Sequence, residues 1–166
     1  MIRVARDDDW PAIREVHRAA FGDEGNDVVR LIDELRADET LYVPELSFVA
    51  QEDGDVVGHV MNTWNLVGDT PVLQLSPLGV LPAYQGRGYG SALARASVDA
   101  VRARGEPALI LEGNPKYYGR FGFVRADELG LLPPPEALVD WAVQVAVFDE
   151  ERLPRGQIVY SPPFRT

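Results

Sequence analysis

The sequence contains no cysteine in its 166 residues. This absence excludes disulfide bonds, thiolate zinc sites and a cysteine nucleophile. Histidine is almost as scarce, since only His17 and His59 occur. A histidine-rich metal site is therefore not expected, and we expect no bound metal.

Positive charge is also scarce. Lys and Arg number 16 against 26 Asp and Glu, which gives a formal net charge of −10. Such a field repels nucleic acid phosphates and anionic lipids, and it mildly favours small cations. No apolar run approaches the length of a membrane span, and the N-terminal MIRVARDDDW resembles neither a signal nor a transit peptide. We therefore expect a cytoplasmic protein that binds neither nucleic acid nor membranes.

The length and the hydrophobic share of 46% fit one globular domain over residues 1–166. Apolar periodicity and turn signals, such as Asp53-Gly54, predict an α+β order of elements. The expected elements are a strand at 2–6, helices at 7–21 and 28–38, a hairpin at 46–67, a strand at 71–80, a helix ending near 104, a strand at 108–112, helical turns at 115–121, a strand at 123–126 and a last strand at 141–149.

The strand at 71–80 carries an irregularity in its apolar alternation. Leu73 and Leu75 have one parity, whereas Leu78 and Val80 have the other. The shift falls at Ser76-Pro77, and proline cannot donate a hydrogen bond to a sheet. We interpret this as a β-bulge at about 76–78, with a strand that ends at Ser76 as the alternative.

The run PAYQGRGYGSAL at 82–93 puts glycines at every second position where a helix begins. It lacks the spacing and the lysine of a P-loop. Gly86 and Gly88 fit a dinucleotide fingerprint, but Ser91 stands where its third Gly or Ala belongs, and the preceding strands are antiparallel. The remaining interpretation is Gln-x-x-Gly-x-Gly. Here the N–H groups of a turn and of the first helical residues point at one anion, and glycine lets the backbone approach it.

The run LGVLPAYQGRGYGSAL, followed by a helix, a buried strand and NPKYYGRFGF at 114–123, resembles the GNAT superfamily of acyl-CoA-dependent N-acyltransferases, of the small stand-alone bacterial type. The resemblance is strongest from about 57 to 124. It implies a mixed, mostly antiparallel, V-splayed central sheet flanked by helices. It also implies that acyl-CoA enters between PLGV at 77–80 and ALILE at 108–112.

The same resemblance implies roles for individual residues. The Val80 N–H would donate to the thioester oxygen, and Tyr118 would protonate the departing thiolate, with Tyr117 as the alternative acid. Asn114 would bond the pantetheine amide, and a helix N-cap before Pro115 is a compatible second role. The residues expected to contact acetyl-CoA are Leu78, Gly79, Val80, Gln85, Gly86, Arg87, Gly88, Tyr89, Gly90, Ser91, Asn114 and Tyr118.

The general base is not identified by the sequence. His59 lies on a central strand, where a structural role is the usual one, Glu112 ends a buried strand and could act through a water, and Glu24 lies in the acidic segment FGDEGND. Without cysteine, an acyl-cysteine intermediate is excluded, so direct attack in a ternary complex is expected.

The function that these features predict is transfer of an acetyl group from acetyl-CoA to a primary amine. The alternative is a non-catalytic acyl-CoA-binding sensor or scaffold, whereas a nucleic-acid-binding module is opposed by the charge. The acceptor stays open among amino acids, polyamines, aminoglycoside-like compounds and protein N-termini. A sheet edge near the C-terminus would allow a homodimer.

Overall fold

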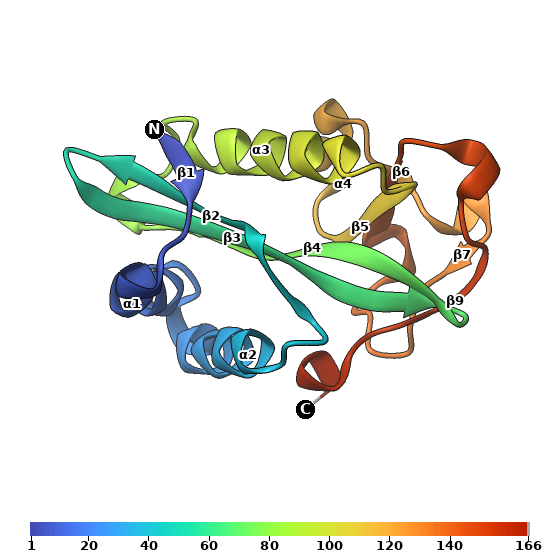
Figure 1. Ribbon diagram of the computed structural model, residues 1–166, viewed down its shortest axis with the longest axis horizontal. Helices are drawn as coiled ribbons and strands as arrows, with labels where there is room; N and C mark the ends of the chain where they lie inside the picture. Colours follow the sequence, from blue (N-terminus) through green and yellow to red (C-terminus); the bar gives the residue numbers. More distant parts are fainter. Residues whose placement is uncertain (166) are drawn as a thin grey trace. The chain divides into compact units, whose positions relative to one another are not determined.

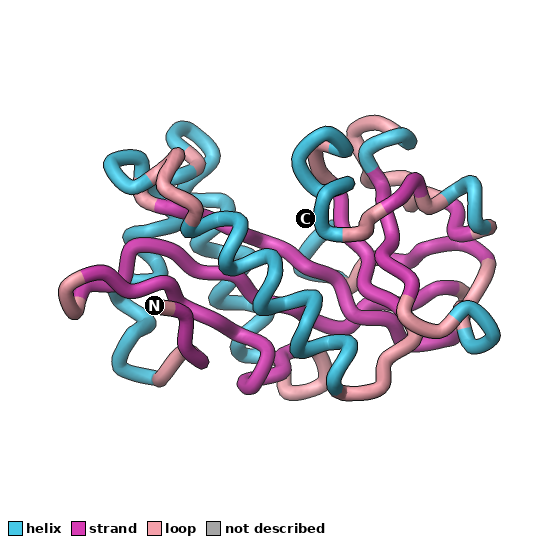
Figure 2. Tube along the Cα trace, turned by 90° about the horizontal axis from the view of Figure 1, so that it is seen from above, coloured by secondary structure: helices cyan, strands magenta, loops and turns pink. Residues whose placement is uncertain are grey.

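The computed structural model describes residues 1–165 and comprises two compact units (Figure 1). Unit 1 contains residues 1–63 and 75–97, and unit 2 contains residues 64–74 and the chain from 98 onward. Three elements pass from one unit into the other along the chain, namely β3 (Asp55–Val67), β4 (Thr70–Val80) and α3 (Tyr89–Ala103). Figure 2 shows α3 as one uninterrupted helix. The expectation of a single domain over 1–166 stays a prediction.

Unit 1 is built on an antiparallel sheet that a tight hairpin organises. Its strands are β1 (Ile2–Val4) and β2 (Tyr42–Glu52), together with the adjoining parts of β3 and β4. β1 pairs with β2 through Arg3 and Val49, and β2 pairs with β3 through Val49 and His59. At the tip of the β2–β3 hairpin, Asp53 and Gly54 have φ values of 51° and 85°. Positive φ at both central residues is typical of the type I′ turn, which confirms the predicted hairpin.

The helices of unit 1 each bury apolar side chains on one face. α1 (Trp10–Ala20) and α2 (Gly25–Ala37) lie on one side of β2 and β3, and the first part of α3 lies on the other (Figure 1). α1 buries Trp10, Ile13, Val16 and His17, and α3 buries Leu93. Short 3₁₀ turns occupy Asp7–Asp9, Gly22–Glu24 and Pro82–Tyr84.

Unit 2 adds the remaining strands and one short helix: β5 (Ala108–Glu112), α4 (Pro115–Tyr118), β6 (Val124–Arg125), β7 (Leu131–Leu132), β8 (Val143–Val147) and β9 (Gly156–Val159). β5 runs parallel to β4, with Leu73 opposite Leu109, and antiparallel to β8. Its 3₁₀ turns are Gly119–Phe121, Asp127–Leu129, Asp140–Ala142, Glu150–Arg152 and Pro162–Arg165. The strand order β1-β2-β3-β4-β5-β8-β6 is mixed and mostly antiparallel. This confirms the predicted α+β class, while the V-shaped splay stays a prediction.

Two details differ from the sequence expectation, and one stated alternative is excluded. The strand at 141–149 is not the last, because β9 follows it and pairs with both β3 and β7. β9 has only four residues, and apolar and polar residues alternate weakly in it. The strand is therefore defined by its pairing with β3 and β7 and not by its sequence pattern. β4 does not end at Ser76, because it continues through a cis Ser76-Pro77 peptide to Val80; the bulge itself stays a prediction. α2 begins at Gly25, three residues before the expected helix start at 28.

Gly25 of α2 packs directly on the backbone of α1, and this gives a test of the packing of unit 1. A Cβ at Gly25 would lie 2.3 Å from the backbone oxygen of Arg18. Gly25→Ala should therefore destabilise the protein by about 1–3 kcal/mol, the usual cost of overpacking. Gly119→Ala is the matched control, because a Cβ there meets nothing within 4 Å. Urea unfolding measures both variants, and equal stabilities would contradict the packing described.

Candidate functional site

The glycine-rich turn before α3 adopts the conformation that its sequence requires. Gly86 and Gly88 have φ values of 77° and 89°, in the left-handed region that favours glycine. A Cβ at either position would meet nothing within 4 Å in the protein, and residues 85–88 are exposed. Gly90 and Ser91 follow in the first turn of α3, at the N-terminal end of the helix. The turn thus exposes backbone donors at the positive end of a helix dipole.

Gln85 ties this turn to the end of β4. Its Nε2 donates a hydrogen bond of 3.0 Å to the carbonyl oxygen of Val80. The Leu81 N–H in turn donates to the Val57 oxygen of β3 at 2.9 Å. The predicted residues Leu78, Gly79 and Val80 therefore lie on a strand end that is fixed both to its neighbour and to the turn. Gln85 acts here as a positioning residue through its side chain.

Arg87 and Tyr89 flank the turn and make contacts within unit 1. The Arg87 Nη1 donates to the Glu52 carboxylate at 3.3 Å, and its guanidinium lies 5.1 Å from the Tyr84 ring centroid. The ring of Tyr84 also meets that of Tyr89 edge to face at 6.3 Å. The Arg87–Glu52 pair is exposed, so an incoming phosphate can compete for the guanidinium.

Behind the strand end lies a buried hydrogen-bonded chain that the sequence did not predict. His17 Nε2 lies 2.8 Å from His59 Nδ1, and His59 Nε2 lies 2.8 Å from Ser47 Oγ. Each of the three side chains is fully buried, at 0% exposure. They come from α1, β3 and β2, so the chain links the helix to the sheet. The sequence places one histidine on α1 and one on β3, but their spacing of 42 residues does not show that they are hydrogen-bonded to each other.

Burial keeps both imidazoles neutral. It lowers the pKa of His17 to about 4, and it holds the pKa of His59 well below its ordinary value, with the neighbouring His17 lowering it further. His17 Nδ1 has no hydrogen-bond partner. The network therefore favours the tautomer with the His17 proton on Nε2, donated to His59, whose own Nε2–H is donated to Ser47.

The unpartnered His17 Nδ1 faces Gly79. A Cβ at Gly79 would lie 2.9 Å from this nitrogen and 3.4 Å from the Cβ of Ala20. In glycine a hydrogen occupies that position, so the imidazole packs directly on the backbone of Gly79. Gly79 thus has a reason within the protein to be glycine, because α1 packs directly on its backbone.

In unit 2, Gly113 brings together Asn114 and Tyr118, the predicted site residues of that unit. A Cβ at Gly113 would lie 2.5 Å from Cε2 of Tyr118, so the phenol ring packs directly on the glycine. The Asn114 Oδ1 accepts the Lys116 N–H at 3.0 Å, which confirms the predicted N-cap of α4. This cap uses only the side-chain oxygen, whereas the amide NH₂ of Asn114 carries two donors.

Tyr118 is half-buried among aromatic rings. Its ring centroid lies 4.9 Å from that of Tyr117 and 6.0 Å from that of Phe123. Burial, with a smaller contribution from Tyr117, raises the pKa of Tyr118 to about 12. The phenol is therefore protonated at neutral pH and can act as a proton donor but not as a base.

Glu112 accepts a hydrogen bond on each carboxylate oxygen. The Tyr160 hydroxyl donates to Oε1 at 3.0 Å, and the Leu138 N–H donates to Oε2 at 3.1 Å. Burial and the Glu112 carboxylate raise the pKa of Tyr160, so the phenol stays a donor. Tyr160 and Leu138 are both remote from Glu112 in sequence, and the sequence did not predict these two hydrogen bonds. Glu24, the third candidate base, is exposed in the turn Gly22–Glu24.

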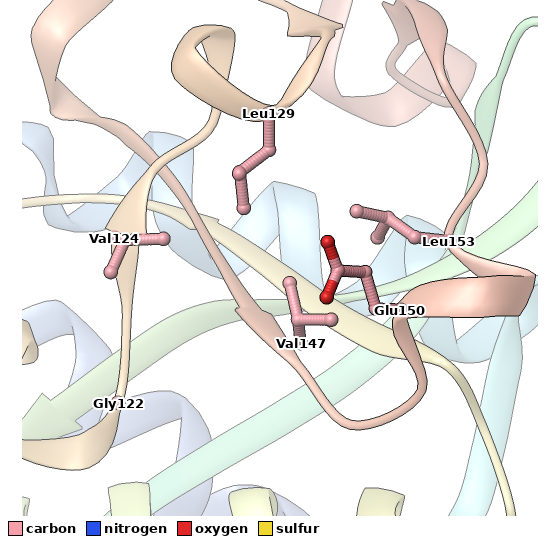
Figure 3. A pocket seen from close by; sticks show the side chains of 6 residues that line it. All are labelled: Gly122, Val124, Leu129, Val147, Glu150 and Leu153. Atoms are coloured by element: carbon pink, nitrogen blue, oxygen red, sulfur yellow. The ribbon is translucent and has the colours of Figure 1, made fainter.

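Two cavities of unit 2 differ in their relation to these residues. The first, of about 520 Å³, is lined by Glu112, Gly113, Asn114, Lys116, Leu138, Val139, Trp141 and Ala142. The second, of about 240 Å³, is shown in Figure 3, where aliphatic side chains surround the carboxylate of Glu150. None of the residues that the sequence predicts for the site lines the second cavity, so the first is the candidate site of unit 2.

Two negative findings concern only the described part of the chain. Within residues 1–165, no three His, Cys, Asp or Glu side chains are grouped so as to hold a metal ion. No helix in that range combines the length and apolar character needed to cross a membrane. The cytoplasmic location, the lack of a metal and the homodimer stay predictions.

Comparison with known proteins identifies related sequences. Residues 1–126 match the model of the family described as acetyltransferase (GNAT) domain. The N-acetyltransferase YjhQ of Escherichia coli K12 is 36% identical over 115 residues, which cover 67% of this chain and 62% of YjhQ. The match thus spans less than two thirds of that relative.

Solved structures resemble the whole fold. The GNAT family N-acetyltransferase YhbS from Escherichia coli, in complex with CoA, has a TM-score of 0.89 at 28% identity and covers 100% of this chain and 92% of its own. A GNAT family acetyltransferase from Brucella melitensis, in complex with acetyl-CoA, has a TM-score of 0.80 at 33% identity. The match covers 99% of this chain and 97% of the Brucella melitensis chain.

The buried histidine pair predicts a pH dependence of stability. Both pKa values are lower in the folded protein than the ordinary value of 6.5, so the unfolded chain binds more protons as the pH falls below 6.5. Stability should therefore fall between pH 7 and pH 5, by about 2 kcal/mol from His17 alone, and His59 should change it in the same direction. This loss precedes most carboxylate protonation.

Urea unfolding at several pH values measures this loss, and ¹⁵N NMR of the two imidazoles reports their tautomers. A flat profile from pH 7 to pH 5, or imidazolium signals at pH 6 in the folded protein, would contradict the neutral pair.

Proposed function

Because the chain belongs to the GNAT acetyltransferase family, we propose that it transfers an acetyl group from acetyl-CoA to a primary amine. The observation that carries this proposal is the turn before α3. Two glycines with positive φ expose backbone donors at a helix N-terminus, and Gln85 fixes that turn to Val80. The CoA and acetyl-CoA complexes of the YhbS and Brucella melitensis proteins support the choice of donor.

The proposed reaction is direct transfer between two bound substrates. The neutral amine nitrogen attacks the thioester carbonyl carbon, and a C–N bond forms as the C–S bond breaks. The amine loses one proton and the CoA thiolate gains one, so the products are an N-acetyl amine and the CoA thiol. The protein has no cysteine that could carry the acetyl group between the substrates.

The backbone at Val80 has the role of stabilising charge on the thioester oxygen. A backbone N–H aimed at that oxygen is most effective when it is held rigid before the reaction. The contact of His17 with Gly79 and the bond from Gln85 to the Val80 carbonyl both restrain this strand end. The neutral His17–His59–Ser47 chain thus has a positioning role. It has no role as the base, because both nitrogens of His59 are bonded within the buried chain.

Tyr118 has the role of general acid, and Asn114 that of a donor to the pantetheine arm. The pKa of about 12 keeps the Tyr118 hydroxyl protonated until the thiolate forms. Glu112 is the proposed acceptor of the amine proton, directly or through a water, because Tyr160 and Leu138 hold its carboxylate at the wall of a cavity.

Binding of the donor predicts a thermal shift. At one hundred times its Kd, acetyl-CoA should raise the Tm by about 5–10 °C, since ligand binding stabilises the native state by mass action. Gly88→Val should abolish that shift, because a side chain at this φ distorts the turn and obstructs the phosphates.

Gly105→Val is the matched control for backbone strain. Gly105 has a φ of 84° and open space around its Cβ position, like Gly88, but it lies after the C-terminal end of α3. Both variants should lose stability, and only Gly88→Val should lose the response to acetyl-CoA. A wild-type Tm that saturating acetyl-CoA does not move would refute the proposed function.

Removal of the proposed acid separates catalysis from binding. Tyr118→Phe should lower kcat by about 100-fold or more and leave the acetyl-CoA-induced Tm shift intact. Tyr117→Phe is the control, since its ring packs beside Tyr118 and offers the alternative acid. CoA release monitored with a thiol reagent gives kcat. Full turnover in Tyr118→Phe would remove this residue from the role, and a loss in Tyr117→Phe alone would assign the role to its neighbour.

A further inference from the structure

The cavity beside Glu112 combines one carboxylate with an exposed apolar wall. Its volume of about 520 Å³ lies in the range of small-molecule sites. Leu138 is 91% exposed, Trp141 51% and Val139 40%, although all three are large apolar side chains. They lie within four residues of one another on the segment before β8. Grouped apolar exposure of this kind indicates a surface that a ligand covers.

The carboxylate is prepared to receive a cation. Each oxygen of Glu112 accepts one hydrogen bond, from Tyr160 or from the Leu138 backbone. A carboxylate oxygen has two lone pairs, so each can accept one more donor. An ammonium group meets this need with up to three N–H donors, and the net charge of −10 favours a cationic ligand.

Lys116 limits how much positive charge a ligand can carry. It lines the same cavity and is the only lysine of the protein. A ligand with a second ammonium group would place like charges close together in a partly apolar site, which is unfavourable. Polyamines and aminoglycosides are therefore poor ligands for this cavity, whereas a single ammonium attached to an apolar body suits it.

The cavity adjoins the proposed acid within unit 2. Gly113 lines the cavity, and the Tyr118 ring packs directly on Gly113. Asn114, with its capping side chain, lines the cavity as well. The apolar wall, the carboxylate and the phenol are thus grouped around one glycine.

We propose that this cavity binds the acceptor, and that the acceptor is a primary monoamine with an apolar or aromatic group. Glu112 binds the ammonium, and Trp141 and Leu138 cover the apolar group. This inference rests on the proposed acetyl transfer and specifies its substrate class.

An amine panel tests the class directly. With acetyl-CoA, 2-phenylethylamine and hexylamine should give kcat/KM values at least about tenfold above those of ethanolamine, spermidine and kanamycin, because burial of the apolar group contributes to binding. Release of the CoA thiol gives the rates. Equal or higher rates with spermidine or kanamycin would overturn the inference.

Substitutions in the cavity sharpen the test. Trp141→Ala should raise KM for 2-phenylethylamine about tenfold and leave the acetyl-CoA-induced Tm shift unchanged. Leu132→Ala is the matched control, since Leu132 is 48% exposed and does not line the cavity. Lys116→Glu should raise the ratio of spermidine to 2-phenylethylamine turnover. An unchanged KM in Trp141→Ala would overturn the proposal.

Binding measurements distinguish failure of the proposed acceptor site from failure of the proposed acetyl transfer. If acetyl-CoA shifts the Tm but no amine of the panel is turned over, binding of the acceptor is tested separately. The measurement is quenching of tryptophan fluorescence by 2-phenylethylamine in the presence of CoA. Saturable quenching that Trp141→Ala removes supports the acceptor site, and no saturation overturns it. If acetyl-CoA does not shift the Tm, and no CoA thiol is released with any amine of the panel, the proposed function itself fails.

Discussion

The contact between His17 and Gly79 is the constraint on which the arrangement of unit 1 depends. The buried imidazole lies so close to the glycine that no Cβ fits between them, and its other nitrogen is bonded to His59 and through it to Ser47. Helix α1 is thus fixed to the end of β4. The glycine-rich turn follows this strand end, and Gln85 bonds back to Val80. The backbone of this strand end and turn is thus restrained by neutral buried groups behind it.

Glycine serves two different physical purposes around the predicted site. Gly86 and Gly88 are needed for their left-handed φ, and space around them is open. Gly79 and Gly113 are needed because a histidine and a tyrosine ring, respectively, pack directly on the backbone. From the sequence, these glycines are expected to let the backbone approach an anion. The structure adds a conformational reason at 86 and 88, and a packing reason at 79 that involves no ligand.

Local patterns predicted most of the fold. Asp53-Gly54 identified the hairpin, and the apolar stretch at 108–112 became the buried strand β5, because both signals are short-range. The missed strand is β9, which is defined by its pairing with β3 and β7 rather than by its own pattern. The strand predicted at 71–80 is present as β4 and runs through Ser76. The turn at 85–88 and the cap at Asn114 were predictable for the same local reason.

The sequence by itself determined the family, the α+β class and the turn that binds the donor in the proposed reaction, because these follow from motifs of adjacent residues. Only the tertiary structure decided which distant groups meet. The spacing of 42 residues between His17 and His59, or of 48 between Glu112 and Tyr160, carries no information about contact. Their hydrogen bonds form because folding buries polar groups that must then find partners. The exposed wall of Leu138 and Trp141 beside Glu112 likewise depends on the backbone bond that Leu138 donates to that carboxylate.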